Sequence, residues 1–154
     1  MQKNEEKLNK LLSEVFNDIL KIEQNTLKNG VLKDISITEI HTIEAIGMYT
    51  SRTMSEVAAD LKITVGTLTT AINKLTKKGY VERERIEEDR RVVMIKLTKK
   101  GKVAYRIHEK FHREMTRATI ENLNEKESEQ LILLLENLNR FFKEKYDLAN
   151  NKEQ

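Results

Sequence analysis

The chain has 154 residues, of which 38% are hydrophobic and 34% charged, and it contains neither proline nor cysteine. Its length predicts one domain with a core of useful size, and its composition is typical of a mainly helical, water-soluble protein. No apolar run is long enough to span a bilayer, and the N-terminus lacks the apolar segment of a signal peptide, so we expect a cytoplasmic protein. The lack of cysteine excludes disulfides and thiol switching.

The basic residues are concentrated in the middle of the chain. The net charge is only +3, but residues 62–106 hold 13 lysines and arginines against 5 acids, which leaves the remainder acidic overall. A local basic excess on a weakly charged protein is typical of a nucleic-acid-binding surface.

Two helices are predicted before this basic region. The first runs from about Asn4 to Leu27 and ends before a turn at Asn29-Gly30; its apolar stripe comprises Leu8, Leu11, Leu12, Val15, Phe16, Ile19 and Leu20. The second begins near Ser36 with a capping box and directs Ile40, Ile43 and Ile46 inward.

Residues 53–79 predict a helix-turn-helix. Thr53 and Glu56 form a capping box for a short helix, and Thr64 is a good N-cap for a second helix that stops at Gly79. Only two residues are left between the helices, which suits a tight helix-helix turn.

The second of these helices has one apolar and one polar face. Val65, Leu68, Ile72 and Leu75 are predicted to point inward. The opposite face holds no acid, and its small polar and basic groups suit a helix in the major groove: Gly66, Thr67, Thr69, Thr70, Asn73, Lys74 and Lys77. We expect the threonines and the asparagine at bases or nearby phosphates, the lysines at phosphates, and Gly66 at a close backbone approach. The alternative is a solvated helix face.

A β-hairpin follows, with strands at about residues 80–86 and 92–97 and a fully charged connection at residues 87–91. Because it comes directly after a candidate recognition helix, we interpret it as a wing that carries an arginine into the minor groove.

Two long helices complete the chain, one from Thr98 to about Asn122 and one from Asn124 to about Tyr146. The last contains more apolar residues than one buried face needs, which predicts a surface shared between two subunits together with the first helix. A dimer also suits the reading of DNA, because one helix contacts too few base pairs to select a genomic site and a twofold pair reads a palindrome.

The run DRRVVMIKLTKKG at residues 89–101, placed after a helix-turn-helix, resembles the MarR family of winged-helix repressors. DISITEIHTIEAIG, ITVGTLTTAINKLTKKGYVER and RIHEKFH are similar to its FabT-like branch, which regulates bacterial fatty-acid synthesis. The resemblance implies a mainly α (α+β) fold, a winged helix-turn-helix with long N- and C-terminal dimerisation helices. Residues 1–154 would form a single domain, with 36–97 as the DNA-binding lobe and 1–28 plus 98–148 as the dimerisation helices. Arg91 would be the wing arginine oriented by Asp89, with Arg90 as a second candidate.

The histidines allow several interpretations. His108 to His112 match H-E-x-x-H formally, but no substrate cleft or open metal position is indicated, so we expect no catalytic residues and no enzyme. Some MarR-type repressors sense zinc with histidines in this region, which suggests an alternative metal set of Glu23, His41, His108 and His112. Our primary expectation is no metal and no cofactor, with the histidines in a polar pocket or in the core.

In the FabT-like branch the co-repressor is a long acyl chain on acyl carrier protein. The resemblance places that chain in an apolar crevice with these wall and polar residues: Phe16, Ile19, His41, Ile43, His108, Phe111 and His112. Simple core roles are the alternative. A basic landing surface for the acidic carrier is predicted at Lys99, Lys100, Lys102 and Arg106, unless that patch contacts DNA non-specifically.

The sequence thus predicts a homodimeric repressor of double-stranded DNA, with no membrane partner, that controls lipid-synthesis genes and responds to acyl-acyl carrier protein. The alternative effectors are zinc or another small lipophilic ligand. A winged helix that binds only proteins is a further alternative, although its exposed face would more often be apolar.

Overall fold

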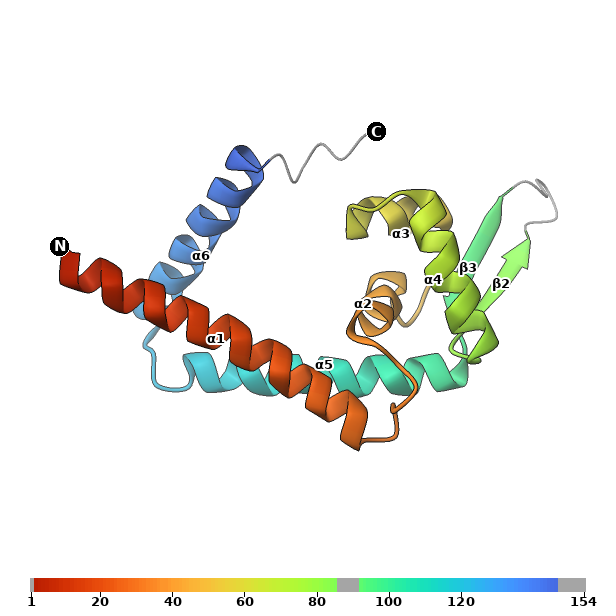
Figure 1. Cartoon of the computed structure of the whole chain (residues 1–154), viewed down its shortest axis with the longest axis horizontal. Coiled ribbons are helices and arrows are strands. Elements are labelled where there is room, and N and C mark those ends of the chain that lie inside the picture. The colour runs from red at the N-terminus through yellow and green to blue at the C-terminus, as the bar shows by residue number, and fades with distance from the viewer. Residues whose placement is uncertain (1, 86–91, 147–154) are drawn as a thin grey trace. The chain divides into compact units, whose positions relative to one another are not determined.

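The computed structural model describes residues 2–85 and 92–146, and the chain divides into two compact units, residues 1–41 and 42–154. The described elements, in chain order (Figure 1), are α1 (Gln2–Asn29), α2 (Ile37–Ile46), β1 (Arg52–Thr53), α3 (Met54–Leu61), α4 (Val65–Lys77), β2 (Val81–Arg85), β3 (Val93–Leu97), α5 (Lys99–Ile120) and α6 (Glu125–Lys145). The predicted mainly helical chain with a winged helix-turn-helix is therefore confirmed. None of the described helices is long and apolar enough to cross a membrane.

The first unit is dominated by α1, whose apolar stripe is largely solvent-exposed in the single chain. Leu8, Leu11, Val15, Phe16 and Leu20 each expose about half of their surface or more. Burial begins near the C-terminal end of the unit, at Glu23, Leu27, Leu32, Ile35 and Ile40. The start of α2 carries the predicted capping box, in which the Ser36 amide donates to Glu39 at 2.8 Å and the Glu39 amide donates to the Ser36 hydroxyl at 3.2 Å.

The second unit contains the helix-turn-helix and the wing. Its sheet has the order β1-β3-β2 with antiparallel pairing, and Val81 lies opposite Leu97 while Arg85 lies opposite Val93. β1 was not predicted; Arg52 and Thr53 pair with Ile95 and Met94 of β3. A two-residue strand has no sequence period to detect, and only its partner strand defines it.

Side chains of α3, α4, the sheet and α5 form the core of this unit. The fully buried residues include Val57, Leu68, Ile72, Leu75, Tyr80, Ile95 and Ala104. The prediction that Val65 points inward is wrong, because this side chain is 45% exposed. Val65 is the first residue of α4, directly after the N-cap Thr64, whereas the buried residues Leu68, Ile72 and Leu75 lie further along the helix.

Local capping signals fix the ends of the helix-turn-helix. The Thr53 amide and hydroxyl donate to the Glu56 carboxylate at 2.8 and 2.9 Å, and the Glu56 amide donates to the Thr53 hydroxyl. Lys62 ends α3 with a φ of 54°, and Gly79 follows α4 with a φ of 78°. Positive φ at Gly79 carries no steric cost, so the chain can reverse directly into β2.

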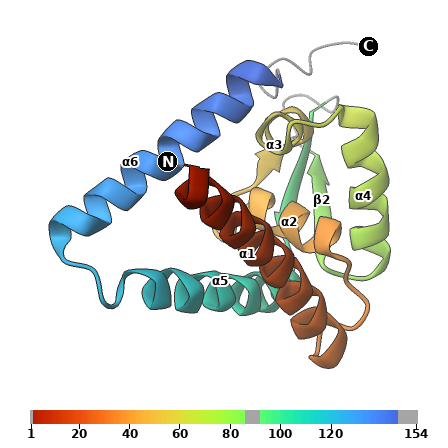
Figure 2. The ribbon, with the colours of Figure 1, turned by 60° about the vertical axis from the view of Figure 1, so that its left-hand side comes forward.

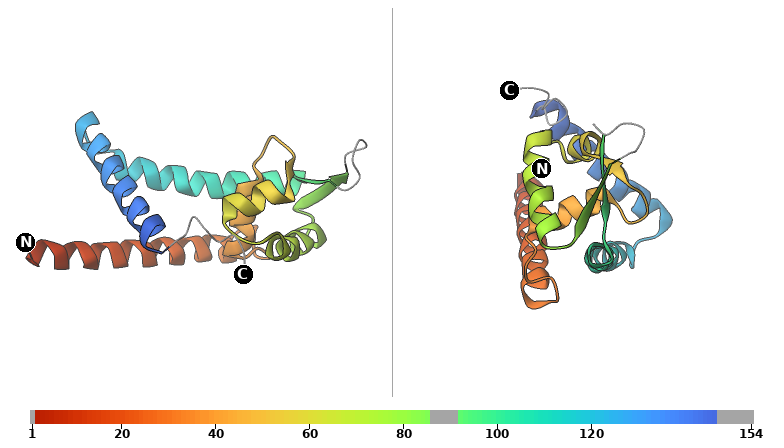
Figure 3. Two further views of the ribbon diagram at one scale, coloured as in Figure 1. Left: turned by 90° about the horizontal axis from the view of Figure 1, so that it is seen from above. Right: turned by 90° about the vertical axis from the view of Figure 1, so that its right-hand side faces the viewer.

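The wing lies beside α4. Figure 2 and the right-hand view of Figure 3 show β2 and β3 next to this helix, and β2 follows α4 after a short turn. Arg83 contacts Asn73, and Arg85, at the far end of β2, lines one hollow with Thr69, so the strand runs back along the helix towards its first turns.

Candidate nucleic-acid interface

The polar face of α4 is exposed to solvent, as the sequence predicted. Leu68, Ile72 and Leu75 are buried against the core, which turns the opposite face outward. On that face Gly66, Thr67, Thr70, Asn73, Lys74 and Lys77 are exposed and Thr69 is half-buried. The predicted recognition residues thus lie along one accessible side of one helix.

Hydrogen bonds fix the orientation of the threonines. The Thr64 hydroxyl accepts from the Thr67 amide at 3.1 Å and caps the helix. The Thr69 hydroxyl donates to the Val65 carbonyl at 2.8 Å, and the Thr70 hydroxyl donates to the Gly66 carbonyl at 3.4 Å. With their protons committed to the backbone, Thr69 and Thr70 present oxygen lone pairs and methyl groups outward.

The structure adds two arginines that the sequence analysis did not assign to this surface. The Arg83 Nη2 atom donates to the Asn73 Oδ1 atom at 2.6 Å. Arg83 and Arg85 also line a hollow of about 580 Å³ together with Met54, Thr69 and Val93. The signal was present in the alternation of residues 81–85, since Arg83 and Arg85 share a strand face with the buried Val81.

The acidic residues of β2 lie on the other face of the strand. Glu82 and Glu84 pair with the Lys96 ammonium on β3 at 3.6 and 3.1 Å. The hydrogen bond from Lys96 to Glu84 raises the pKa of the lysine above its ordinary value of 10.5. The face towards α4 therefore keeps its positive charge. The predicted wing residues Asp89, Arg90 and Arg91 lie outside the described residues.

The three histidines lie in two close groups with glutamates, one group in each unit. Within the first unit, His41 Nε2 lies 3.7 Å from Glu23 Oε1. Within the second, His108 Nε2 lies 3.1 Å from His112 Nε2, and His108 Nδ1 lies 3.6 Å from Glu44 Oε2. Glu109, the residue that a zinc protease would use as its general base, instead pairs with Arg113 at 3.2 Å.

The predicted effector residues differ in exposure. Ile43 is fully buried and His108 is 6% exposed, whereas Phe16 is 51% exposed. Ile19, His41, Phe111 and His112 are half-buried. An apolar crevice walled by this set remains a prediction.

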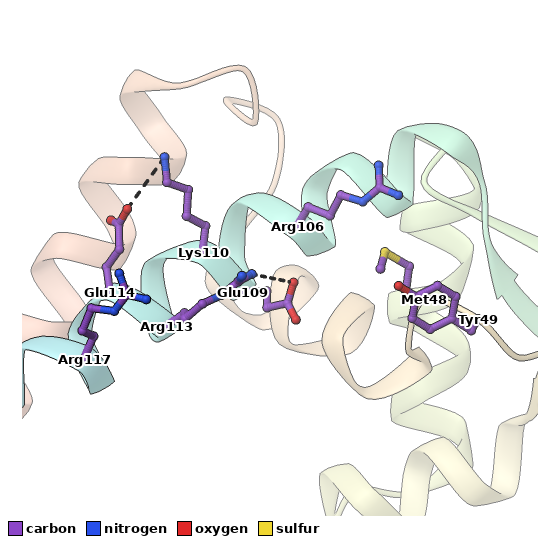
Figure 4. A pocket seen from close by; sticks show the side chains of 8 residues that line it. All are labelled: Met48, Tyr49, Arg106, Glu109, Lys110, Arg113, Glu114 and Arg117. Carbon is purple, nitrogen blue, oxygen red and sulfur yellow. Dashed lines mark hydrogen bonds and ion pairs between the residues drawn. The ribbon is translucent and has the colours of Figure 1, made fainter. Parts of the chain in front are cut away.

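A cavity of about 570 Å³ lies beside α5 and has a different lining. Figure 4 shows Met48 and Tyr49 at one end and charged residues of α5 along it: Arg106, Glu109, Lys110, Arg113, Glu114 and Arg117. Lys110 pairs with Glu114 at 3.7 Å and Arg113 with Glu109. The lining is therefore basic overall, with two of its four cations already neutralised.

The four residues of the predicted carrier surface do not share one environment. Lys100 donates to the Lys78 carbonyl at 2.9 Å and lies 4.0 Å from the centre of the Tyr80 ring. Lys99 and Arg106 are exposed, and Lys102 is half-buried. Positions 99, 102, 106, 110, 113 and 117 recur at helical spacing, so the basic face continues along α5 towards the cavity of Figure 4.

This combination of a helix-turn-helix, an exposed threonine-, asparagine- and lysine-bearing second helix and an adjoining hairpin defines a winged-helix DNA-binding protein. The MarR family model matches residues 35–93. The HTH-type transcriptional regulator BilQ of Clostridium symbiosum (strain WAL-14163) is 31% identical over 107 residues, which are 69% of this chain and 74% of that protein.

Solved structures agree with this assignment. Streptococcus pneumoniae FabT, in a crystal structure with DNA, is 42% identical and superposes with a TM-score of 0.82 over 90% of this chain and 97% of that one. The S. aureus MepR–DNA complex shares the fold, with a TM-score of 0.69 and 20% identity over 88% of this chain and 97% of that one. The chain belongs to the MarR family of transcriptional regulators, and the prediction that it is not an enzyme is confirmed.

Proposed function

We propose that this regulator is a homodimeric repressor that binds a palindromic operator and controls genes of fatty-acid synthesis. One observation carries the proposal: α4 exposes an acid-free face of threonine, asparagine and lysine in a chain 42% identical to a FabT that was crystallised with DNA. Within the exposed face, Thr67, Thr69, Thr70 and Asn73 would contact bases or nearby phosphates. Lys74 and Lys77 would contact phosphates, and Gly66 would allow a close backbone approach.

The wing completes the contact in this proposal. Arg91 enters the minor groove and Asp89 orients it, with Arg90 as the second candidate. An arginine in a narrow minor groove gains from the negative potential there. Operator binding implies that the protein works in the cytoplasm.

Two subunits would bind the two half-sites of a palindrome. The exposed apolar side chains of α1 and α6 support this arrangement, because a single chain leaves them in water: Leu8, Leu11, Phe16, Ile132, Leu134, Leu135 and Phe141. Patches of this extent usually mark protein–protein contacts. We infer that residues 1–28 and 98–148 form the dimer and that residues 36–97 bind the DNA.

The effector we propose is a long acyl chain on acyl carrier protein. An acidic carrier fits the basic face of α5, which starts at Lys99, Lys102 and Arg106 and extends through Arg113 to Arg117. Binding of the acyl chain would change the spacing of the two recognition helices and so raise the affinity of the dimer for the operator.

Zinc is the second candidate effector. The 3.1 Å between His108 Nε2 and His112 Nε2 is close to the separation of two ligand atoms on a tetrahedral zinc ion, about 3.3 Å for Zn–N bonds near 2.0 Å. The carboxylate of Glu44 next to His108 Nδ1 is the kind of partner that orients a metal-bound histidine.

One titration tests operator binding and distinguishes the two candidate effectors. A duplex is selected by the protein from a randomised library, and its affinity is measured by fluorescence anisotropy against salt, with acyl-acyl carrier protein, with the unacylated carrier, with zinc and with chelator. We expect affinity to fall steeply with salt, as counterion release requires, and to rise only with the acylated carrier.

The charge-reversal variant Arg106→Glu should lose the carrier response, whereas Lys33→Glu, in the exposed loop after α1, should keep it. No duplex affinity at low salt would refute the repressor. A response to zinc and not to the acylated carrier would replace the lipid effector with the metal.

A further inference from the structure

The strand β2 runs beside the recognition helix α4, and two arginines of the strand lie next to two polar residues of the helix. Val81 is buried, so the alternation of the strand puts Arg83 and Arg85 on the face towards α4. Arg83 bonds to Asn73, and Arg85 shares the hollow with Thr69, one turn earlier in α4. Two residues of strand span about 6.6 Å and four residues of helix span about 6 Å. The spacing of the two arginines along β2 therefore matches the spacing of Asn73 and Thr69 along α4.

The contact between Arg83 and Asn73 determines which way the asparagine amide faces. A guanidinium has donors and no acceptor, so the atom 2.6 Å from Arg83 Nη2 must be the amide oxygen. The amide NH₂ group therefore points away from Arg83. A hydrogen bond to a charged donor is about twice as strong as a neutral one, which makes this orientation the preferred one.

The orientation bears directly on base recognition. An asparagine reads adenine with both ends of its amide, since the oxygen accepts from N6 and the nitrogen donates to N7. Arg83 occupies one of the two lone pairs of the amide oxygen, and its guanidinium competes with an adenine N6 group for access to that oxygen, so the amide meets base edges mainly through its NH₂ donors. Donors suit the acceptor edges of guanine, at O6 and N7, and of thymine, at O4, whereas adenine offers N7 alone beside its N6 donor.

We propose that Arg83 is a specificity-determining residue that holds Asn73 as a hydrogen-bond donor and so directs it to guanine or thymine in preference to adenine. Arg85 has no hydrogen bond to Asn73 among the described residues, and its guanidinium would contact the phosphate backbone of the DNA. The inference rests on the proposed DNA binding by α4, and it adds β2 to the recognition surface.

The first test needs no DNA. In the ¹⁵N–¹H spectrum of the whole protein, the side-chain NH₂ resonances of Asn73, assigned by their absence from Asn73→Ala, should shift clearly in Arg83→Ala. They should stay nearly unchanged in Arg85→Ala, which removes the same charge from the same strand face. Thermal melting should show both variants folded, because both arginines are exposed. Unshifted Asn73 resonances in Arg83→Ala would refute the contact.

The second test measures base preference. The wild type and the variants Asn73→Ala, Arg83→Ala and Arg85→Ala each select operators from the same library. The Asn73 position is the base pair whose preference disappears in Asn73→Ala. At that pair the wild type should favour guanine or thymine, and Arg83→Ala should shift the ratio towards adenine by about 5-fold or more, the lower end of one bidentate contact. Arg85→Ala should weaken binding to all sequences alike and reduce the salt slope by about one.

Each outcome bears on one claim. If Asn73→Ala loses a preference that Arg83→Ala retains, Arg83 does not set the specificity. If the wild type prefers adenine at that pair, the proposed donor role of Asn73 is wrong while the repressor stands. If the wild type binds no duplex at all, the proposed function fails, and the spectrum still reports on the contact itself.

Discussion

Single side chains at the start of α3 show how local hydrogen bonds create a pH dependence. Hydrogen bonds from the backbone N–H and then the hydroxyl of Thr53 lower the pKa of the Glu56 carboxyl below its ordinary value of 4.5. A carboxyl with a depressed pKa in the folded state stabilises the fold above the unfolded value and loses that contribution as the pH falls through the folded value.

Glu56→Gln should remove this pH dependence while it preserves the shape of the capping box. We expect the thermal midpoint of the wild type to fall more than that of Glu56→Gln when the pH is lowered from 6 to 3, with most of the difference below pH 4.5. Melting curves followed by circular dichroism at each pH provide the measurement. Parallel curves for the two proteins would show that the carboxylate contributes nothing to stability.

At the scale of elements, the start of α5 is fitted closely to the turn before β2. The Thr98 hydroxyl donates to the Gly79 carbonyl at 2.6 Å, and the Thr98 amide donates to the Tyr80 carbonyl at 3.0 Å. A Cβ atom on Gly101 would lie only 2.1 Å from the Tyr80 carbonyl oxygen. Because that oxygen belongs to backbone held by hydrogen bonds, it cannot move aside cheaply.

Gly101→Ala should therefore destabilise the protein by about 1–3 kcal/mol, as overpacking typically does, even though alanine is the better helix former. Gly66→Ala is the matched control in α4, because its Cβ would meet only the Thr64 hydroxyl, at 3.9 Å. Gly66→Ala should keep or slightly raise stability and weaken duplex binding, since its methyl group occupies space proposed for the DNA. Equal stability of the two variants in urea would contradict the close fit.

At the scale of the molecule, the described part of α6 has no buried residue, although it holds five leucines and two phenylalanines. Leu134 is 64% exposed and Leu133 is 54% exposed in the single chain. Apolar area of this kind stabilises by about 25 cal/mol per Å² when it leaves water, which favours a second chain as its cover.

Leu134→Glu should convert the proposed dimer into a folded monomer, because a buried unpaired charge is costly at an interface. Sedimentation velocity measures the change, with Gln130→Glu as the control that adds the same charge to the same helix at a polar, exposed position. The operator affinity of Leu134→Glu should fall by about 100-fold or more, since one half-site contact replaces two linked ones. A monomeric wild type would refute the dimer.

Among the local features, the helix-turn-helix could be predicted almost residue by residue. Thr53, Thr64, Thr98 and Asn124 each cap the helix that follows them, and Gly79 has the positive φ that its position after α4 suggested. These signals act within about four residues, because a cap bonds to amides of its own first turn. The amphipathic spacing of α4 likewise determined which of its faces is exposed.

Tertiary structure decided what depends on partners distant in the sequence. β1 exists because β3 lies beside it, and Gly101 is constrained because the Tyr80 carbonyl is there. Arg83 and Asn73 meet across ten positions because the turn at Gly79 folds β2 back along α4. The sequence by itself determined the helices, the hairpin and the exposed polar face, since periodicity and capping are local. Only the packed fold fixed which way Asn73 presents its amide, because that orientation is imposed by a side chain from another element.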